Sequence, residues 1–421
     1  MLMEEVVMYL HEVDADFFKG FDRIKVPFNT RFTILSGPNG VGKSSVLFAI
    51  ASAITISYGP LPLNEQTQCK IEFTDRNNNR DCCGFGPNSY KMISRRVSQF
   101  MGGPKAYLFR DGSAKYIFKN DVAEYFSPLF IGPNRNIFYQ KIEGMKSERT
   151  PHEYRVEYLN NAITNLANGY TPEIKQWMIN RYFIIEKDWA VEEKKNWDYI
   201  ISHLDFIFGG DSRFAFGNIE RDLEPNFILD GALVYLEDLS SGFKSILSIV
   251  LSIVEWIEKT NERSNMDIET ATGVVLIDEL DAHLHPSWQT KIREILQTLF
   301  TCIQFIVTSH SPHIISSAEA GEVIVLKREG KEMGYDVIDK PLDAWKTDDI
   351  YSLIMGVSTV HQQTLSDVVN KIEDLISGKL FEEALSLIDE YSKKIPDSDP
   401  TAMILRKQID FVQLKIERGV K

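Results

Sequence analysis

The segment Gly37–Ser44, which is Gly-Pro-Asn-Gly-Val-Gly-Lys-Ser, constrains this chain more than any other. It follows the apolar run Arg31–Ser36, which predicts a strand, and precedes Ser45–Ala51, which predicts a helix. A strand, a glycine-rich loop and a Lys-Ser pair that opens a helix form the phosphate-binding loop in its required context. A glycine turn that matches by chance is the alternative, but both flanks argue against it. The sequence therefore predicts a nucleotide-binding protein.

The chemistry of this loop assigns a role to each part of it. Glycines let backbone N–H groups turn toward phosphate oxygens, and the helix N-terminus adds a positive end. We expect Lys43 to reach the β- and γ-phosphates of the nucleotide and the Ser44 hydroxyl to ligate Mg²⁺. The expected nucleotide-binding residues of this segment are Gly37, Pro38, Asn39, Gly40, Val41, Gly42, Lys43, Ser44 and Ser45.

Length and composition are those of a globular protein with two or three domains. The chain has 421 residues, of which 43% are hydrophobic and 25% are charged. Its net charge of −14 supplies no overall positive field for nucleic acid or anionic lipid. DNA binding is therefore not supported by charge, and it would need a local basic groove or a partner.

The cysteines and the apolar segments predict a cytoplasmic protein without membrane contact. Cys69, Cys82, Cys83 and Cys302 form no CxxC pair and no disulfide framework, which fits a reducing compartment. Two loop thiols are the favoured interpretation of the adjacent Cys82 and Cys83, with a metal site as the alternative. The N-terminus lacks the basic region of a signal peptide. The most apolar segment, Ile246–Ile257, is too short to span a bilayer and predicts a buried helix.

Apolar runs predict an α/β fold with a mixed, mainly parallel sheet. The first two strands give an antiparallel opening before the parallel part begins. The expected strands outside the phosphate-binding loop are Val6–Val13, Ile24–Val26, Lys70–Phe73, a hairpin of Tyr107–Phe109 and Lys115–Phe118 around Asp111–Gly112, Leu129–Ile131, Phe214–Phe216, Leu233–Leu236, Gly273–Ile277 and Phe305–Thr308. Residues 153–208 are helical, polar and aromatic without sustained heptads, so they predict a short helical arm and exclude a long coiled coil.

Two of these strands end in residues that carry chemistry. Gly273–Ile277 is followed by Asp278 and Glu279, and Phe305–Thr308 is followed closely by His310. Sites in open α/β sheets lie at the carboxyl ends of the strands. Each residue alone has a structural interpretation, as a solvated strand end or a satisfied histidine. Their order after a phosphate-binding loop and a Ser-Gly helix start favours one common site.

With these motifs the chain resembles ABC-type P-loop ATPases, in the soluble branch that includes SMC, DNA-repair and overcoming-lysogenization-defect (OLD-like) proteins of the AAA family. Gly37–Ser44 matches Walker A, and Val274–Asp278 matches Walker B. Leu239–Phe243 resembles the ABC signature, and Leu280–Pro286 resembles the D-loop. In the signature, Ser241 replaces the usual middle glycine and Phe243 the usual glutamine. The resemblance covers about residues 1–75 and 230–330.

The resemblance implies further roles. Asp278 holds Mg²⁺, Glu279 orients or deprotonates the attacking water, and His310 is the switch histidine at the γ-phosphate. It also implies that two chains sandwich two ATP molecules. The residues that would then contact nucleotide outside Walker A are Ser240, Ser241, Gly242 and Asp281. The expected Q-loop follows Leu129–Ile131, where Arg135 replaces the usual glutamine or lies in a surface turn. Gln140 lies further on.

The motifs and this resemblance also predict the domain boundaries. Residues 1–150 form the N-terminal lobe of an ABC-type head and 151–212 the helical arm. Residues 213–345 form the C-terminal lobe with the signature, Walker B and switch histidine, and 346–421 form a helical hairpin. The hairpin is predicted from the apolar spacing of Leu375, Leu380, Ala384, Leu387 and Ile388, then of Leu405, Ile409, Val412 and Ile416, joined at Pro396–Pro400.

The Asp-Glu-Leu-Asp-Ala-His-Leu-His-Pro run at 278–286 is similar to that of ATPases in bacterial anti-phage systems. The Septu-type ATPase subunit (PtuA-like), which works with a separate HNH nuclease, is the nearest resemblance, and the PARIS-type ATPase is an alternative. His283 and His285 belong to this pattern, so zinc binding is disfavoured. We expect an ATPase that forms a homodimer or a higher oligomer and regulates a separate nuclease. A DNA-repair ATPase and a transporter ATPase are the rivals, and gene neighbours would distinguish the three.

Overall fold

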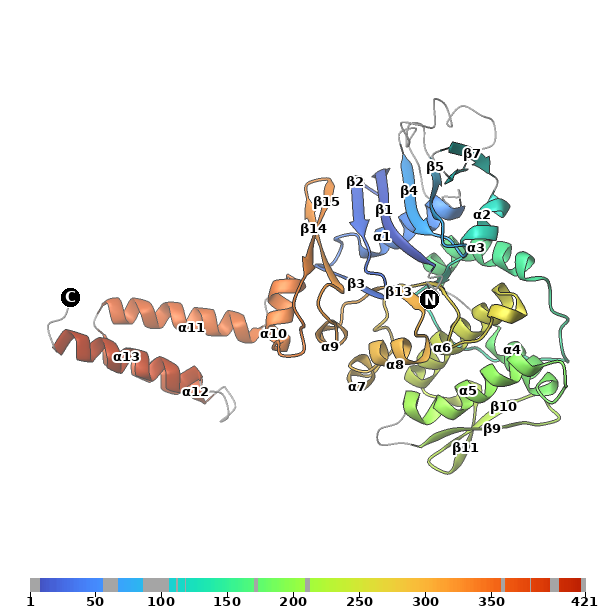
Figure 1. Cartoon of the computed structure of the whole chain (residues 1–421). Helices are drawn as coiled ribbons and strands as arrows, with labels where there is room; N and C mark the ends of the chain where they lie inside the picture. Colours follow the sequence, from blue (N-terminus) through green and yellow to red (C-terminus); the bar gives the residue numbers. More distant parts are fainter. Residues whose placement is uncertain are drawn as a thin grey trace, which may run out of the picture. The chain divides into compact units, whose positions relative to one another are not determined.

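The computed structural model describes residues 8–55, 67–85, 106–110, 113–117, 119–169, 173–208, 213–356, 360–378, 380–393 and 401–417. Within it the chain divides into two compact units, Met1–Thr347 and Asp348–Lys421 (Figure 1). Each unit is described by itself below.

The first unit is built on a mixed sheet of twelve strands among the described residues, in the order β7-β6-β5-β4-β1-β2-β15-β14-β3-β13-β12-β8. The bounds of its strands are β1 Tyr9–Phe18, β2 Phe21–Pro27, β3 Phe32–Ser36, β4 Gln68–Thr74, β5 Arg80–Phe85, β6 Ala106–Arg110, β7 Ser113–Ile117, β8 Leu129–Ile131, β12 Gly273–Ile277, β13 Ile303–Thr308, β14 Val323–Glu329 and β15 Glu332–Ile338. The predicted mixed sheet, its antiparallel opening and the β6–β7 hairpin are confirmed.

One half of this sheet is parallel and carries the strands that precede the motifs. β14, β3, β13, β12 and β8 are parallel neighbours. Every residue of β3, β12 and β13 is buried. Continuous apolar runs are typical of parallel strands that are covered on both faces, and this explains why the sequence shows no alternation there.

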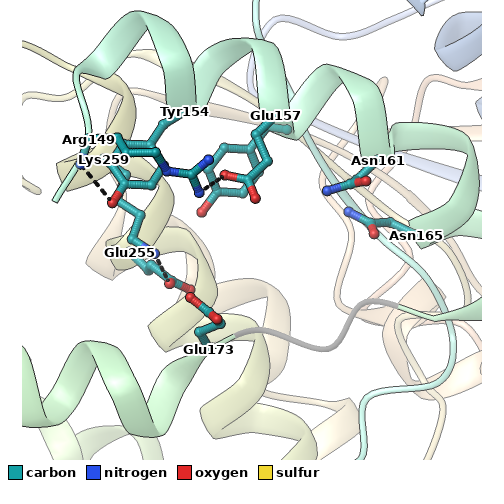
Figure 2. Close-up of a pocket in the computed structure, with 9 residues that line it drawn as sticks. Arg149, Tyr154, Glu157, Asn161, Asn165, Glu173, Glu255 and Lys259 are labelled. Atoms are coloured by element: carbon teal, nitrogen blue, oxygen red, sulfur yellow. Dashed lines mark hydrogen bonds and ion pairs between the residues drawn. The ribbon is translucent and has the colours of Figure 1, made fainter. Parts of the chain in front are cut away.

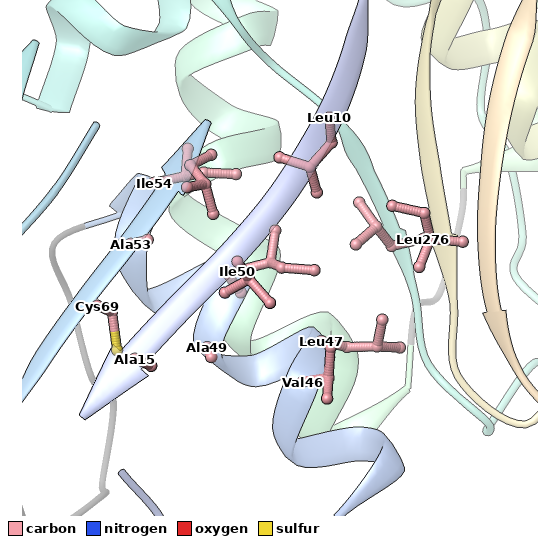
Figure 3. Close-up of a cluster of buried hydrophobic side chains, with 14 of the residues drawn as sticks. Leu10, Ala15, Val46, Leu47, Ala49, Ile50, Ala53, Ile54, Cys69 and Leu276 are labelled. Carbon is pink, nitrogen blue, oxygen red and sulfur yellow. The ribbon is translucent and has the colours of Figure 1, made fainter. Parts of the chain in front are cut away.

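The helix that follows the phosphate-binding loop, α1 (Lys43–Thr55), lies in the core. Its side chains pack against β1 and β4 and against Leu276 of β12 (Figure 3). The helix α3 (Pro151–Asn168) contributes Leu159, Ala162 and Leu166 to the same core. The first helix of the predicted arm is thus packed against the head. Capping of α3 by Thr150 and Glu153 marks its start.

The remaining elements of the first unit cover the sheet or extend from it. A separate three-stranded antiparallel sheet contains β9 Phe214–Ile219, β10 Pro225–Leu229 and β11 Ala232–Tyr235. The sequence predicts β9 and β11 of these three strands. The other helices are α2 Lys119–Tyr125, α4 Ile174–Ile184, α5 Val191–Phe208, α6 Ser241–Thr260, α7 Pro286–Gln289, α8 Ile292–Leu299 and α9 Pro312–Ser316. The short α10, Thr347–Asp349, spans the sequence boundary between the two units. The predicted buried helix at Ile246–Ile257 is the centre of α6.

The second unit is helical, as predicted. Its main helices are α11 Val360–Ser377, α12 Phe381–Ser392 and α13 Thr401–Glu417. Ile372, Ala384, Ile388, Leu405 and Ile409 form its core. The amphipathic run from Leu375 to Ile388 is two helices, because α11 ends at Ser377 and the N–H of Gly378 bonds back to the carbonyl of Asp374.

A few predictions differ from the structure or lie outside it. Cys82 and Cys83 are in strand β5, so their assignment to a loop is wrong; Asp81–Phe85 pair with Cys69–Phe73 of β4 in an antiparallel ladder. Asp111–Gly112, Pro396–Pro400 and the first residues of Val6–Val13 lie outside the described residues. None of the helices in the described part of the chain has the length and apolarity needed to cross a membrane.

Candidate functional site

The parallel half of the sheet brings the separated motifs to one edge. β13 lies between β3 and β12, and β12 is followed by β8. The carboxyl ends of parallel strands meet at the same edge. Four segments therefore lie at this edge of the sheet: the loop after β3, the Asp278–Glu279 pair after β12, His310 after β13 and Arg135 after β8.

The phosphate-binding loop has the backbone that its glycines permit. Gly40 has φ +73°, a left-handed conformation that favours glycine. Gly37 has φ +131°, and a Cβ there would lie 2.6 Å from the carbonyl oxygen of Leu326. The ammonium of Lys43 donates to the carbonyls of Gly37 and Pro38 at 2.8 and 3.1 Å. The Lys43 side chain thus folds back over the phosphate-binding loop and places its positive charge there.

Lys43 is buried, and burial lowers its pKa to about 8. The nearby carboxylates of Asp281, Asp278 and Glu279 act in the opposite direction. A buried cation without a close anionic partner favours an anionic ligand, because burial disfavours the uncompensated charge. The buried ammonium of Lys43 is therefore suited to a phosphate oxygen.

Ser44 and Asp278 are in direct contact. The Ser44 hydroxyl donates to Asp278 Oδ1 at 3.0 Å, and the hydroxyl of Thr308 donates to the same oxygen at 2.6 Å. A hydroxyl and a carboxylate at this spacing are the donor types that hold Mg²⁺ beside a phosphate. Sequence reasoning missed Thr308, which is the last residue of β13 and whose role depends on the neighbouring strand.

Glu279 has an unusual backbone. Its φ is +51°, in the left-handed region that a residue with a Cβ rarely adopts. The N–H of Glu279 donates to the Thr308 hydroxyl oxygen at 2.7 Å, and Arg135 Nη2 donates to the Glu279 carbonyl. Strained backbone concentrates at functional sites, where surrounding contacts maintain it.

Asp281 acts on the switch-histidine segment within the same chain. Its Oδ1 accepts hydrogen bonds from the Ser309 hydroxyl at 2.7 Å and from the His310 N–H at 3.0 Å. Burial and the nearby Lys43 charge lower the pKa of His310. The imidazole is therefore neutral at pH 7 and has both a donor and an acceptor nitrogen.

The signature segment begins α6 and lies apart from these contacts. Ser240 is the N-cap of α6, and the side chains of Ser240 and Ser241 are exposed and make no hydrogen bond within the described part of the chain. Gly242 is buried, and a Cβ there would overlap the ring of Trp288. Phe243, which replaces the usual glutamine of the signature, stacks on Phe208 with 4.7 Å between the ring centroids. Packing thus explains Gly242 and Phe243, and leaves the two serines facing outward.

The turn between β1 and β2 adds a residue that sequence reasoning missed. Lys19 has φ +47°, and its ammonium lies 3.2 Å from the centroid of the Phe48 ring on α1. Lys19 is exposed as a residue, but partial burial of its ammonium against Phe48 lowers its pKa to about 8, and the charge of Asp278 opposes this. A second lysine therefore lies near the Asp278 end of the site. No motif marks it, because its position depends on the fold of the hairpin.

Two features lie outside this group of residues. His285 caps α7, since its ring nitrogen accepts from the Ser287 N–H at 3.4 Å. A polar cavity of about 140 Å³ lies between α3 and α6 (Figure 2). Glu255 in its wall is buried, which raises the pKa of its carboxyl, and it pairs with Lys259 at 2.6 Å. None of the predicted site residues lines this cavity.

The donor set fits a nucleoside triphosphate with Mg²⁺. The loop offers backbone N–H groups and a buried lysine for phosphate oxygens, and Ser44 and Asp278 offer adjacent oxygens for the ion. Glu279 and His310 complete the edge on the neighbouring strands. This combination supplies charge neutralisation together with a group that can hold a water, which phosphoryl transfer to water requires.

Comparisons with known proteins find a family model, related sequences and a similar solved structure. Residues 32–316 match a family model described as AAA domain, putative AbiEii toxin, Type IV TA system. The Septu protein PtuA of Bacillus thuringiensis is 22% identical over an alignment 421 residues long, and this alignment covers 96% of this chain and 98% of that protein. The Retron Ec83 probable ATPase of Escherichia coli is 27% identical over 230 residues, which cover 52% of this chain and 42% of that protein. A solved SmcHead bound to the C-winged helix domain of ScpA matches with a TM-score of 0.46 at 14% identity, and covers 79% of this chain and 98% of that chain.

Proposed function

The chain belongs to the family described as AAA domain, putative AbiEii toxin, Type IV TA system, and from this premise we propose that it is a cytoplasmic, Mg²⁺-dependent ATPase of an anti-phage defence system. The family match and the Septu and retron relatives confirm the resemblance to P-loop ATPases of anti-phage systems that the motifs indicate.

One observation carries the proposal of hydrolysis. The hydroxyls of Ser44 in the phosphate-binding loop and of Thr308 at the end of β13 both donate to Asp278. Glu279 follows Asp278 directly in the chain. The proposed ion-binding pair is thereby followed directly by a second carboxylate, which is exposed whereas Asp278 is buried. Nucleotide binding alone would need Ser44 and Asp278 but not Glu279. The second carboxylate supports turnover.

Each residue has a role in this proposal. Lys43 and the loop N–H groups bind the phosphates, and Ser44 and Asp278 hold Mg²⁺, which supplies charge neutralisation when bound. Glu279 accepts a proton from the attacking water or orients it. Neutral His310 donates a hydrogen bond toward the terminal phosphate, and Asp281 fixes its backbone.

The exposed signature serines support a site shared between two copies. Ser240 and Ser241 begin the long helix α6 and have free hydroxyls in the described part of the chain. Hydroxyl and backbone donors at a helix N-terminus suit a phosphate. A homodimer would place them at the γ-phosphate held by the partner copy, and higher oligomers would follow from further contacts.

We assign the destructive step of defence to a separate polypeptide. The residues with recognisable catalytic chemistry all serve ATP, and the relative named PtuA belongs to a Septu system. Met403 and Ile404 are 55% and 49% exposed on α13, outside the core of the second unit. Exposed apolar side chains on a helix suit docking to a partner groove. An HNH-type nuclease, the partner expected from the resemblance, fits this role.

The proposal is tested with purified protein. Wild-type chain is expected to release phosphate from ATP with Mg²⁺, and a Lys43→Ala variant is expected to release none above background. Supercoiled DNA incubated with the same protein, ATP and Mg²⁺ is expected to stay intact. Absence of phosphate release from folded, oligomeric wild-type protein would remove the ATPase assignment. DNA cleavage by this chain alone would remove the separate effector.

A further inference from the structure

Arg135 lies in the loop that follows β8, beside the strand end that carries the acidic pair. β8 pairs with β12 in parallel, and the N–H of Asp278 donates to the carbonyl of Ile131 at 2.8 Å. The loop packs tightly against α3, because a Cβ on Gly132 would overlap the carbonyl oxygen of Asn165. Arg135 is therefore held by two packed elements, rather than lying in a surface turn.

The guanidinium of Arg135 is buried, with 1% of the residue exposed. Its Nη2 donates to the Glu279 carbonyl, whereas Nε and Nη1 have no hydrogen-bond partner among the described residues. Burial lowers the pKa of Arg135 to about 10, against the opposing charges of Asp281, Glu279 and Asp278. It remains a cation at pH 7. Burying a cation with so few direct hydrogen bonds is unfavourable, so stability does not explain this residue.

Its hydrogen bond reaches the carboxylate residue of the site that has a left-handed backbone. Glu279 has φ +51°, and its N–H and its carbonyl each make a hydrogen bond. Thr308 accepts from its N–H at 2.7 Å, and Arg135 donates to its carbonyl. The direction of the Glu279 side chain follows from this φ. Loss of either bond lets the backbone relax toward the common right-handed or extended regions.

We propose that Arg135 is a positioning residue that keeps Glu279 in the conformation required to activate the attacking water. The proposal deepens the ATPase function above and rests on it. Arg135 acts through the main chain of Glu279, and Lys43 and Ser44 bind nucleotide without it. Loss of Arg135 therefore lowers turnover and leaves ATP affinity unchanged.

The first test compares arginine variants in the full chain. Arg135→Met removes the donor and keeps much of the volume, and kcat is expected to fall about 10²-fold because catalysis is sensitive to misplacement of about 1 Å. The Kd for ATP is expected to change less than about threefold, since the phosphate ligands remain. Arg135→Lys keeps the charge and one donor, and is expected to recover part of the loss.

A matched control separates positioning from folding. Arg155 on α3 is also buried, donates Nη1 to the Thr260 carbonyl at 2.9 Å, and has an Nε without a partner in the described chain. Arg155→Met is expected to lower the melting temperature about as much as Arg135→Met, with kcat near that of wild type. An equal loss of kcat in both variants would reduce the role of Arg135 to folding.

Two further measurements decide the route of the effect. In a Glu279→Gln background, Arg135→Met is expected to cause no additional loss of turnover, because the two residues act as a unit. Hydrogen exchange of residues 278–284 is expected to accelerate in Arg135→Met and not in Arg155→Met. Exchange needs no turnover, so it decides the inference even if the wild-type chain proves inactive on ATP. Unchanged exchange, or full additivity with Glu279→Gln, overturns it.

Discussion

The hydroxyl of Ser44 donates a hydrogen bond to Asp278 at 3.0 Å, although 234 positions separate the two residues in the chain. Ser44 is the second residue of α1, and Asp278 follows β12. The intervening β13 brings its own hydroxyl, that of Thr308, to the same carboxylate oxygen. The proposed Mg²⁺ site is thus assembled by three consecutive strands of the sheet, β3, β13 and β12.

Glu279→Gln is expected to retain ATP binding and to lose hydrolysis by about 10²-fold or more, because the amide keeps the size of the side chain but cannot accept the proton. Phosphate release under saturating ATP measures the loss, and nucleotide binding by calorimetry measures retention. The control is Glu294→Gln on α8, which changes the same residue type away from the site. Near-normal turnover of Glu279→Gln would place the base elsewhere.

ATP affinity is expected to fall as pH rises through about 8, the pKa of Lys43 in the free site. The phosphates favour the protonated lysine, so affinity is full below this pKa. Above it, affinity decreases by about tenfold per pH unit until the pKa of the complex is reached. Lys43→Ala is expected to bind weakly with a shallower pH dependence. Titrations from pH 6.5 to 9.5 measure both slopes, and an equal slope in the two proteins would contradict the assignment. Lys19→Met tests whether the second lysine contributes.

Thr308→Val is expected to destabilise the protein by about 1–3 kcal/mol, because Asp278 and the Glu279 N–H each lose a buried partner. ATP turnover is expected to fall as well, since Asp278 and Glu279 both lose the hydrogen bond that holds them in place. Thr260→Val is the matched control. Among the described residues, its buried hydroxyl bonds to the Trp256 carbonyl alone, at 2.7 Å. Chemical denaturation and phosphate release distinguish the two variants, and a Thr308→Val protein with normal turnover would show that this hydroxyl is dispensable.

The dimeric sandwich predicts complementation between two inactive chains. Lys43→Ala removes a phosphate ligand, and Ser240→Arg blocks the exposed signature serine. Each variant alone is expected to be inactive, whereas a mixed dimer has one site with neither change and recovers part of the activity. Native mass spectrometry verifies the mixed species. Verified mixed dimers without any recovery would favour a site formed within one chain.

Partner docking is expected to depend on the apolar side chains of α13. Ile404→Glu places a charge where a partner would bury an apolar surface, and is expected to abolish co-purification of a nuclease encoded beside this chain. Lys407→Glu, on the same exposed helix, is the matched control. ATP turnover is expected to be unchanged in both variants, because the core of the second unit uses Leu405 and Ile409. Retained co-purification of Ile404→Glu would move the docking surface away from this helix.

The residues that the sequence identified are those whose chemistry depends on their immediate neighbours. Gly37–Ser44 needs only its own glycines and a flanking strand and helix, so its conformation is encoded within about fifteen residues. The fully buried strands also follow from local apolar runs. Apolar periodicity does not mark every helix end. The apolar spacing continues from Leu375 to Ile388, although the structure has two helices there with a break at Gly378.

The tertiary structure decided which distant groups act on these motifs. Thr308 and Lys19 carry no recognisable pattern, because each acquires its role from a strand or helix far away in the sequence. The Q-loop position marks Arg135, but only the fold shows that it bonds to the Glu279 carbonyl. The left-handed backbone of Glu279 is equally invisible in the sequence, since a residue with a Cβ adopts it only where surrounding contacts maintain it. Local pattern determined the phosphate-binding loop and the acidic strand end. The order of parallel strands in the sheet determined that they form one site, because hydrogen bonding between strands, and not spacing along the chain, sets their neighbours.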